Sequence, residues 1–157
     1  YTTLFRSNGL DDLKNGLIRT PLPPLETFLD DPLRVLRSIR FAARFSFDID
    51  ELLLRAAMGD SVRDALKLKV SRERIGTEID GMFKGAVRLF RFDGLFLDVG
   101  PDPVMAVRNL VDLFLFPIVF LLPENLHLAN YGPACLATLS AAFQLLEQKG
   151  VQVTCCM

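Results

Sequence analysis

The sequence has few of the residues that build metal sites and disulfide frameworks. Its 157 residues include one histidine, His127, and three cysteines, Cys135, Cys155 and Cys156. A single histidine excludes a histidine-rich metal site, so we assign His127 a structural role. The cysteines match no metal-ligand spacing and no disulfide framework, since two of them are adjacent. We therefore expect a reduced, intracellular protein without a metal ligand among these residues.

The chain also lacks a long hydrophobic run and an excess of charge of one sign. The apolar run at residues 110–122 is too short to span a bilayer and contains Asp112 and Pro117. It predicts one or two buried helices and no membrane contact. The formal net charge of −1 gives no global basic field. Basic residues are dense only at 34–44 and 63–74, so contact with nucleic acid would depend on a local patch.

The pattern of apolar residues predicts a mostly α protein. Residues 8–29 look extended and turn-rich, because prolines stiffen the stretch TPLPPLETF. The first clear helix begins near Asp31, with Pro32 at its first helical position, and ends near Phe45. Further helices are expected from Asp48 or Asp50 to Ala57, from Ser61 to Ala65 or Leu66, from Ser71 over RERIGTEIDGMF, and at about residues 103–121 and 134–148. Strands are expected only near residues 17–19 and 87–97.

The helix that begins near Asp31 combines an apolar face with a stripe of arginines. In DDPLRVLRSIRFAARF, arginines recur at every third or fourth position. They are Arg34, Arg37, Arg40 and Arg44. At about 100° per residue, Val35, Leu36, Ile39, Ala42 and Ala43 fall on the other face. Leu33 and Phe41 lie among the arginines, so the basic face is not purely a solvent face.

Asp31 and Arg34 lie three residues apart and can face one edge of a planar ligand. A carboxylate only accepts hydrogen bonds, and a guanidinium only donates them. Cytosine and adenine each place an amino donor beside a ring-nitrogen acceptor, which suits this pair. Uracil and guanine show the reverse, and each mispaired buried group costs roughly 1–3 kcal/mol. The pair could therefore separate C and A from U and G, whereas Arg37 and Arg40 could bind phosphates of the same nucleotide or position the pair.

Spacing alone also permits a simpler interpretation. Asp31 can act only as a helix N-cap, and the arginines can form only a solvated stripe with intrahelical ion pairs. Arg44, one turn beyond the others, is best explained as helix surface.

Four stretches, in order, resemble the class II tRNA nucleotidyltransferases, the CCA-adding enzymes. DDPLRVLRSIRFAARFSFDID is similar to the family's nucleotide-recognition motif, EDxxR. GLDDLKNGLIRTPLPPLETF resembles its head-to-neck motif, and SRERIGTEIDGMFKG resembles the motif that closes the neck. DPVMAVRNLVDLFLF, with LPENL after it, resembles the start of the helical body.

The resemblance implies a role for each matching residue. It implies that Asp31 and Arg34 read the base of CTP and ATP, and that Arg37 and Arg40 assist nucleotide binding. Asp12 and Arg19 match the motif that couples the catalytic head to the neck during the switch from C to A. A separate motif contains Arg72, Glu73 and Arg74, for which a structural role in the neck is implied. Asp30 stands where the family often has Glu, which keeps the charge.

The resemblance also implies a fold and a division of the chain. We expect a multi-helix neck and body fragment, with the α/β catalytic head missing. The expected parts are residues 8–29, the head-to-neck connector; 30–85, the neck; 86–100, an insertion or retained intron; 101–150, the start of the body; and 151–157, an atypical tail. Independently of the family, YTTLFRS at residues 1–7 resembles a translated sequencing adapter, and we expect it to be an artefact.

The implied reaction adds C, C and A to the tRNA 3′ end from CTP and ATP with Mg²⁺. The family's metal-binding carboxylates belong to the head, so we assign no catalytic residue and expect this fragment to bind no metal and to be inactive alone. A fragment of a bacterial-type poly(A) polymerase and a non-catalytic RNA-binding helical module are the alternatives. No stable protein partner is predicted, and nucleus, cytosol, mitochondria and plastid remain open as compartments.

Overall fold

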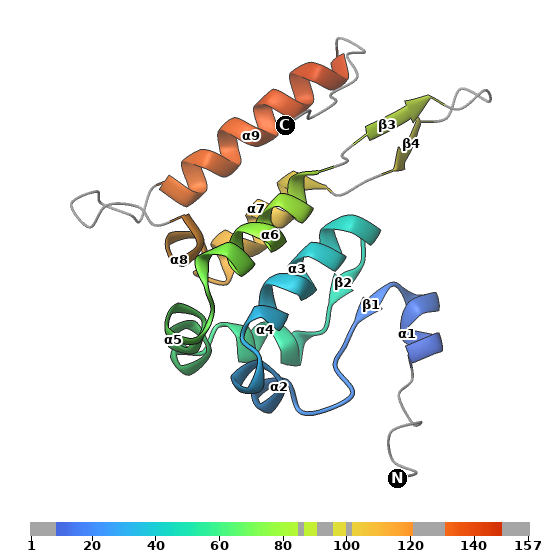
Figure 1. Cartoon of the computed structure of the whole chain (residues 1–157). Helices are drawn as coiled ribbons and strands as arrows, with labels where there is room; N and C mark the ends of the chain where they lie inside the picture. The colour runs from blue at the N-terminus through green and yellow to red at the C-terminus, as the bar shows by residue number, and fades with distance from the viewer. Residues whose placement is uncertain (1–8, 85–86, 91–95, 100–101, 121–130, 149–157) are drawn as a thin grey trace.

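The computed structural model describes residues 9–84, 87–90, 96–99, 102–120 and 131–148 (Figure 1). The helices in these residues are α1 (Gly9–Asn15), α2 (Pro24–Asp30), α3 (Leu33–Phe45), α4 (Glu51–Ala57), α5 (Asp60–Lys69), α6 (Arg72–Phe83), α7 (Pro103–Asp112), α8 (Phe116–Phe120) and α9 (Tyr131–Gln148). The strands are β1 (Leu17–Ile18), β2 (Asp48–Ile49), β3 (Val87–Phe90) and β4 (Phe96–Val99). The prediction of a mostly α chain is confirmed.

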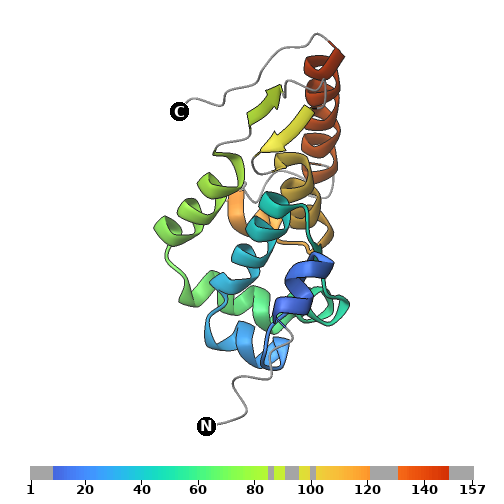
Figure 2. The ribbon, with the colours of Figure 1, turned by 90° about the vertical axis from the view of Figure 1, so that its right-hand side faces the viewer.

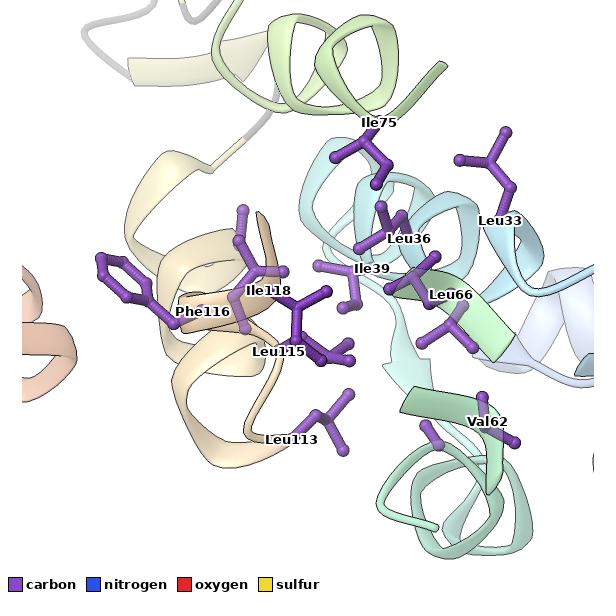
Figure 3. Packing of buried hydrophobic residues seen from close by; sticks show 14 of the residues in the cluster. Leu33, Leu36, Ile39, Val62, Leu66, Ile75, Leu113, Leu115, Phe116 and Ile118 are labelled. Carbon is purple, nitrogen blue, oxygen red and sulfur yellow. The ribbon is translucent and has the colours of Figure 1, made fainter. Parts of the chain in front are cut away.

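Helix α3 lies at the centre of the fold, because its apolar face is buried against several other helices. Leu36 and Ile39 are fully buried, and α3 packs against α6 on one side and α7 on another. Figure 3 shows Ile75 of α6, Val62 and Leu66 of α5 and the residues after α7 closing around them. Burial on this scale fixes which face of α3 is inside, and therefore which face carries the arginines.

Local capping explains the helices that the sequence predicts well. The Asp50 carboxylate accepts a hydrogen bond from the Leu52 N–H at 2.9 Å and so begins α4. The Ser71 hydroxyl accepts from the Arg74 N–H at 3.4 Å at the start of α6. Both N-caps are as predicted, whereas α5 begins at Asp60 after Gly59 rather than after Ser61.

The expectation of an extended segment at residues 8–29 is wrong at two places. Helix α1 covers Gly9–Asn15, and α2 begins at Pro24, which supplies a first-turn residue with no N–H to satisfy. Helix α2 ends at Asp30 and Asp31 is extended, at φ −133° and ψ 96°. Helix α3 therefore begins at Leu33, one residue after the Pro32 that was expected as its first helical residue.

The helix expected at residues 103–121 is also divided. Helix α7 ends at Asp112, Phe114 adopts a left-handed conformation at φ +56°, and α8 begins at Phe116. Pro117 lacks the N–H that a continuous helix would need, and it lies in the first turn of α8, where no such bond is required.

Two pairs of strands add to the helices. β1 pairs with β2 in parallel, Leu17 opposite Asp48, and this attaches the connector before α2 to the turn after α3. β3 and β4 form an antiparallel hairpin within residues 86–100, the stretch expected to be an insertion. The strands expected near 17–19 and 87–97 are confirmed, and β2 was not expected.

The hairpin and one end of α9 lie at one end of the molecule and α2 at the other, as Figures 1 and 2 agree. Helix α9 reaches the rest of the protein through α7, and Gly132 packs against Val111 and Phe116. Residues 1–7 and 151–157, together with His127, Cys155 and Cys156, lie outside the described residues. Cys135 is exposed on α9.

Candidate functional site

The arginine face of α3 is not uniform along its length. Arg34 near the start of the helix and Arg37 are about half exposed, at 43% and 49% of their side chains, whereas Arg40 is only 23% exposed. Arg44, in the last turn, is exposed and lies 5.9 Å from the ring centroid of Phe45. The first three arginines therefore face neighbouring elements, and Arg44 lies at the surface, as the sequence indicates.

Asp31 lies just before α3 and makes two contacts. Its Oδ1 accepts a hydrogen bond from the Leu33 N–H at 3.3 Å, which gives it part of the role of an N-cap. Its Oδ2 lies 3.5 Å from Nη2 of Arg74, on α6. The carboxylate is 28% exposed. One oxygen is therefore held by backbone, and the other is held only by a long contact to an exposed guanidinium.

Arg34 contacts two residues of α2. Its Nη2 lies 3.1 Å from Oδ2 of Asp30, and its Nη1 donates to the Thr27 carbonyl at 3.3 Å. Asp30 is 72% exposed, so this ion pair is a surface pair of low strength. Asp31 and Arg34 are both near the first turn of α3, yet each is paired with a different residue.

A hollow of about 340 Å³ opens beside Arg34. The residues that line it come from the connector, α2 and α3: Thr20, Pro21, Leu22, Thr27 and Arg34. Within the part of the chain that the structure describes, the buried Thr27 hydroxyl has no hydrogen-bond partner. The hollow gives Arg34 room to change its contacts.

Arg37 and Arg40 both face the carboxylate of Glu78, a residue that the sequence motifs do not mark as part of the site. Glu78 of α6 is only 8% exposed, and its Oε2 lies 2.8 Å from Nε of Arg40, although the angle is not that of a hydrogen bond. Its Oε1 lies 4.0 Å from Nε of Arg37. Glu78 lies on the same stripe of α6 as buried Ile75 and Met82. A carboxylate on a buried stripe requires a cation, and that signal could have identified Glu78.

Asp12 and Arg19, predicted to act together, lie in contact. Nη1 of Arg19 lies 3.4 Å from Oδ1 of Asp12. The same guanidinium makes a closer pair with Asp50, at 3.1 Å from both Nε and Nη2 to Oδ2. The sequence predicts Asp50 only as a helix cap, and no local signal marks it as a partner of a residue 31 positions earlier.

The three residues of the neck-closing motif separate into different environments. Arg72 donates from Nη1 to the Ile118 carbonyl at 2.6 Å and so ties α6 to α8. Glu73 is exposed in the first turn of α6. Arg74 pairs with Asp31. The contact of Arg72 is the kind that a structural residue makes, and Arg74 lies next to the candidate site.

Two kinds of site are not found among the described residues. No group of three or more histidine, cysteine, aspartate or glutamate side chains is arranged there to hold a metal ion. In that same part of the chain, no helix has both the length and the apolar composition to cross a membrane.

Comparison with known proteins gives a consistent result. The chain is 44% identical over 117 residues to the mitochondrial CCA tRNA nucleotidyltransferase of Saccharomyces cerevisiae, a match that covers 74% of this chain and 18% of that protein. It is 39% identical over 117 residues to the protein of the same name from Candida glabrata, covering 74% and 19%. A tRNA nucleotidyltransferase of Schizosaccharomyces pombe is 38% identical over 123 residues, covering 72% and 25%. No family model matches the chain.

The chain belongs to the CCA tRNA nucleotidyltransferase family. It spans about a fifth of the length of the first two relatives. The chain is mostly α and corresponds to only part of each related nucleotidyltransferase.

Proposed function

We propose that this chain is the base-recognising neck and the start of the body of an enzyme that adds C, C and A to the tRNA 3′ end from CTP and ATP. The observation that carries the proposal is the placement of Asp31 just before α3 and of Arg34 in its first turn, where Arg34 lines a hollow together with residues of the connector and α2. Family membership supports the reaction class, and this geometry supports the assignment of the base-reading residues.

Asp31 and Arg34 have the chemistry to read one edge of a base. Asp31 Oδ2 would accept the exocyclic amino group of cytosine or adenine, and Arg34 would donate to the adjacent ring nitrogen. The contacts that now hold these groups, to Arg74 and Asp30, are long or exposed. Such contacts cost little to exchange for a base, because surface ion pairs contribute at most about 1 kcal/mol.

Arg37 and Arg40 have different parts in the proposal. Arg37 is half exposed, and its Nε lies as far as 4.0 Å from Oε1 of Glu78. Because this contact is long, Arg37 can turn toward a phosphate of the bound nucleotide. Arg40 is more buried and closer to Glu78, so it would act mainly by fixing the position of α3 against α6. The family resemblance assigns both arginines to nucleotide binding, and the greater exposure of Arg37 favours direct contact for that residue.

Asp12 and Arg19 are proposed to couple the head to the neck. Both lie on the segment that enters the neck, and their ion pair joins α1 to the residue after β1. Arg72, Glu73 and Arg74 are proposed as the structural motif of the neck. Residues 8–29, 30–85 and 101–150 are the proposed connector, neck and start of the body, and 86–100 the proposed insertion.

The Mg²⁺ of the parent reaction does not fit the residues described here, because they contain no cluster of metal ligands. We place it in the catalytic head, outside this chain, and derive no step through it. An intracellular location is part of the same proposal; two of the relatives are named as mitochondrial proteins.

Addition to a tRNA that lacks its CCA end tests the proposed function. The full-length protein that contains this segment should add two C residues and then one A, when CTP and ATP are supplied together. The 157-residue chain alone should add none. Incorporation of CTP by the isolated chain would show that it carries catalytic residues we have not assigned.

The same assay separates the alternatives. A poly(A) polymerase would extend the RNA with ATP alone and make a tail of many residues. A non-catalytic RNA-binding module would retard tRNA on a gel without discriminating among free nucleotides. Either result from the full-length protein would overturn the proposed function.

A further inference from the structure

Asp50 makes contacts in two directions at the junction of the connector and the neck. Its Oδ1 accepts the Leu52 N–H at 2.9 Å, which caps α4. Its Oδ2 accepts from Nε of Arg19 at 3.1 Å and lies 3.1 Å from Nη2 of the same guanidinium. Both carboxylate oxygens are therefore engaged, and the side chain is only 15% exposed.

The backbone around Asp50 is attached to the same connector. The Asp50 N–H donates to the Ile18 carbonyl at 3.0 Å, and the Asp48 N–H donates to the Gly16 carbonyl at 2.8 Å. These are the hydrogen bonds of the short parallel pair β1–β2. Two short strands are marginal by themselves, so a side-chain contact at the end of the pair adds to its stability.

Asp50 holds Arg19 more closely than Asp12 does. Two guanidinium nitrogens lie 3.1 Å from one oxygen of Asp50, whereas a single nitrogen lies 3.4 Å from Asp12. Two contacts from one planar guanidinium fix its orientation as well as its position. The two carboxylates also belong to different elements, since Asp12 is on α1 and Asp50 precedes α4.

We propose that Asp50 is a positioning residue that fixes Arg19, and with it the connector at residues 16–20, to the neck. This proposal rests on the proposed function, because it makes Asp50 the neck-side partner in head-to-neck coupling. Arg19 then bridges an anchor on the neck and a second carboxylate on α1, the side nearer the head. Release of one contact while the other persists would let α1 move without detaching the connector.

Amide hydrogen exchange on the 157-residue chain tests the anchor without any assay of activity. Asp50→Asn removes the charge but keeps a good N-cap. The amides of residues 48 and 50 should exchange about fivefold faster, the ratio that corresponds to about 1 kcal/mol. The amide of Leu52 should change little, because the asparagine still caps α4.

Asp102→Asn is a matched control for this experiment. Asp102 caps α7 by accepting from the N–H groups of Val104 and Met105 at 2.9 and 3.0 Å. This variant should leave residues 48 and 50 unchanged. Asp12→Asn should accelerate them less than Asp50→Asn does. The assignment would be overturned if Asp12→Asn had the larger effect, or if Asp50→Asn accelerated Leu52 equally, which would indicate loss of the cap.

A second measurement connects the anchor to the reaction. In the full-length protein, Asp50→Asn should change the ratio of kcat for A addition to kcat for C addition by about fivefold, with KM for CTP within about twofold of wild type. Equal effects on both additions would contradict a role in coupling. If the wild-type protein adds no CCA, the proposed function fails, and the exchange measurement still decides whether Asp50 anchors Arg19.

Discussion

The first turn of α3 and its middle carry the same type of residue in opposite environments. At the start, Arg34 pairs with exposed Asp30, and Asp31 makes a 3.5 Å contact with exposed Arg74. In the middle, Arg40 lies 2.8 Å from a carboxylate, Glu78, that is 8% exposed. The difference arises because α6 packs against α3 and places Glu78, on the buried stripe of α6, beside Arg40.

Because of this difference, the charged residues at the start of α3 can exchange their ion-pair partners, whereas Arg40 in the middle is held by Glu78. Contacts between exposed charges are screened by water and exchange at little cost. A buried ion pair is costly to break, since removal of one partner leaves an uncompensated charge. One helix can therefore present a ligand-accessible turn while its next turns fix the geometry of that turn.

The largest effect is expected when the middle of the helix loses its carboxylate. Glu78→Gln should lower the free energy of unfolding by about 2 kcal/mol, because Arg40 would remain largely buried without a counter-charge. Urea denaturation followed by circular dichroism measures this. Asp80→Asn, on the exposed face of the same helix, where the carboxylate makes a surface pair with Lys84, is the control and should change stability by less than about 0.5 kcal/mol. Equal effects of the two variants would remove the distinction between the two parts of α3.

A smaller effect is expected from crowding Arg40. A Cβ at Gly81 would lie 2.8 Å from Cδ of Arg40, whereas a Cβ at Gly76 would meet no atom within 4 Å. Gly76→Ala should stabilise α6 by about 0.5–1 kcal/mol. Gly81→Ala should instead destabilise by about 1 kcal/mol, since Arg40 must shift away from Glu78. The same denaturation experiment compares them, and a similar gain in both variants would show that Arg40 is free to move.

The smallest effect is expected at the first turn. Asp30→Asn removes the surface partner of Arg34 and should change the free energy of unfolding by less than about 0.5 kcal/mol. A loss above about 1.5 kcal/mol would mean that this end of α3 is as firmly anchored as its middle.

Local signals predicted much of this fold, and tertiary contacts decided the rest. Asp50 and Ser71 could be predicted as N-caps, because a cap depends on a few neighbouring residues. Helices α1 and α2 have only seven residues each, among glycines and prolines, so their pattern was too short to detect. Strand β2 has two residues and exists through its partner β1, which no local pattern reveals.

In the candidate site, too, local sequence signals identified some residues, and tertiary contacts determined the others. The spacing of Asp31 and Arg34 and the family motif selected them, but their present partners, Arg74 and Asp30, are known only from the structure. Glu78 and Asp50 were missed as partners of arginines, because each lies more than thirty positions from the residue it contacts. Pairings over such distances depend on how α6 and α4 pack, and spacing in the sequence does not record that.

The central claim is that Asp31 and Arg34 read the base, and nucleotide selectivity tests it most directly. In the full-length protein, Asp31→Ala should reduce the ratio of kcat/KM for CTP to kcat/KM for UTP by about tenfold or more, because a mispaired polar group then no longer opposes uracil. Discrimination of ATP from GTP should fall in the same way, and Asp30→Ala should leave both ratios within about twofold of wild type. Unchanged selectivity in Asp31→Ala would contradict the claim and leave Asp31 with only its capping hydrogen bond to the Leu33 N–H.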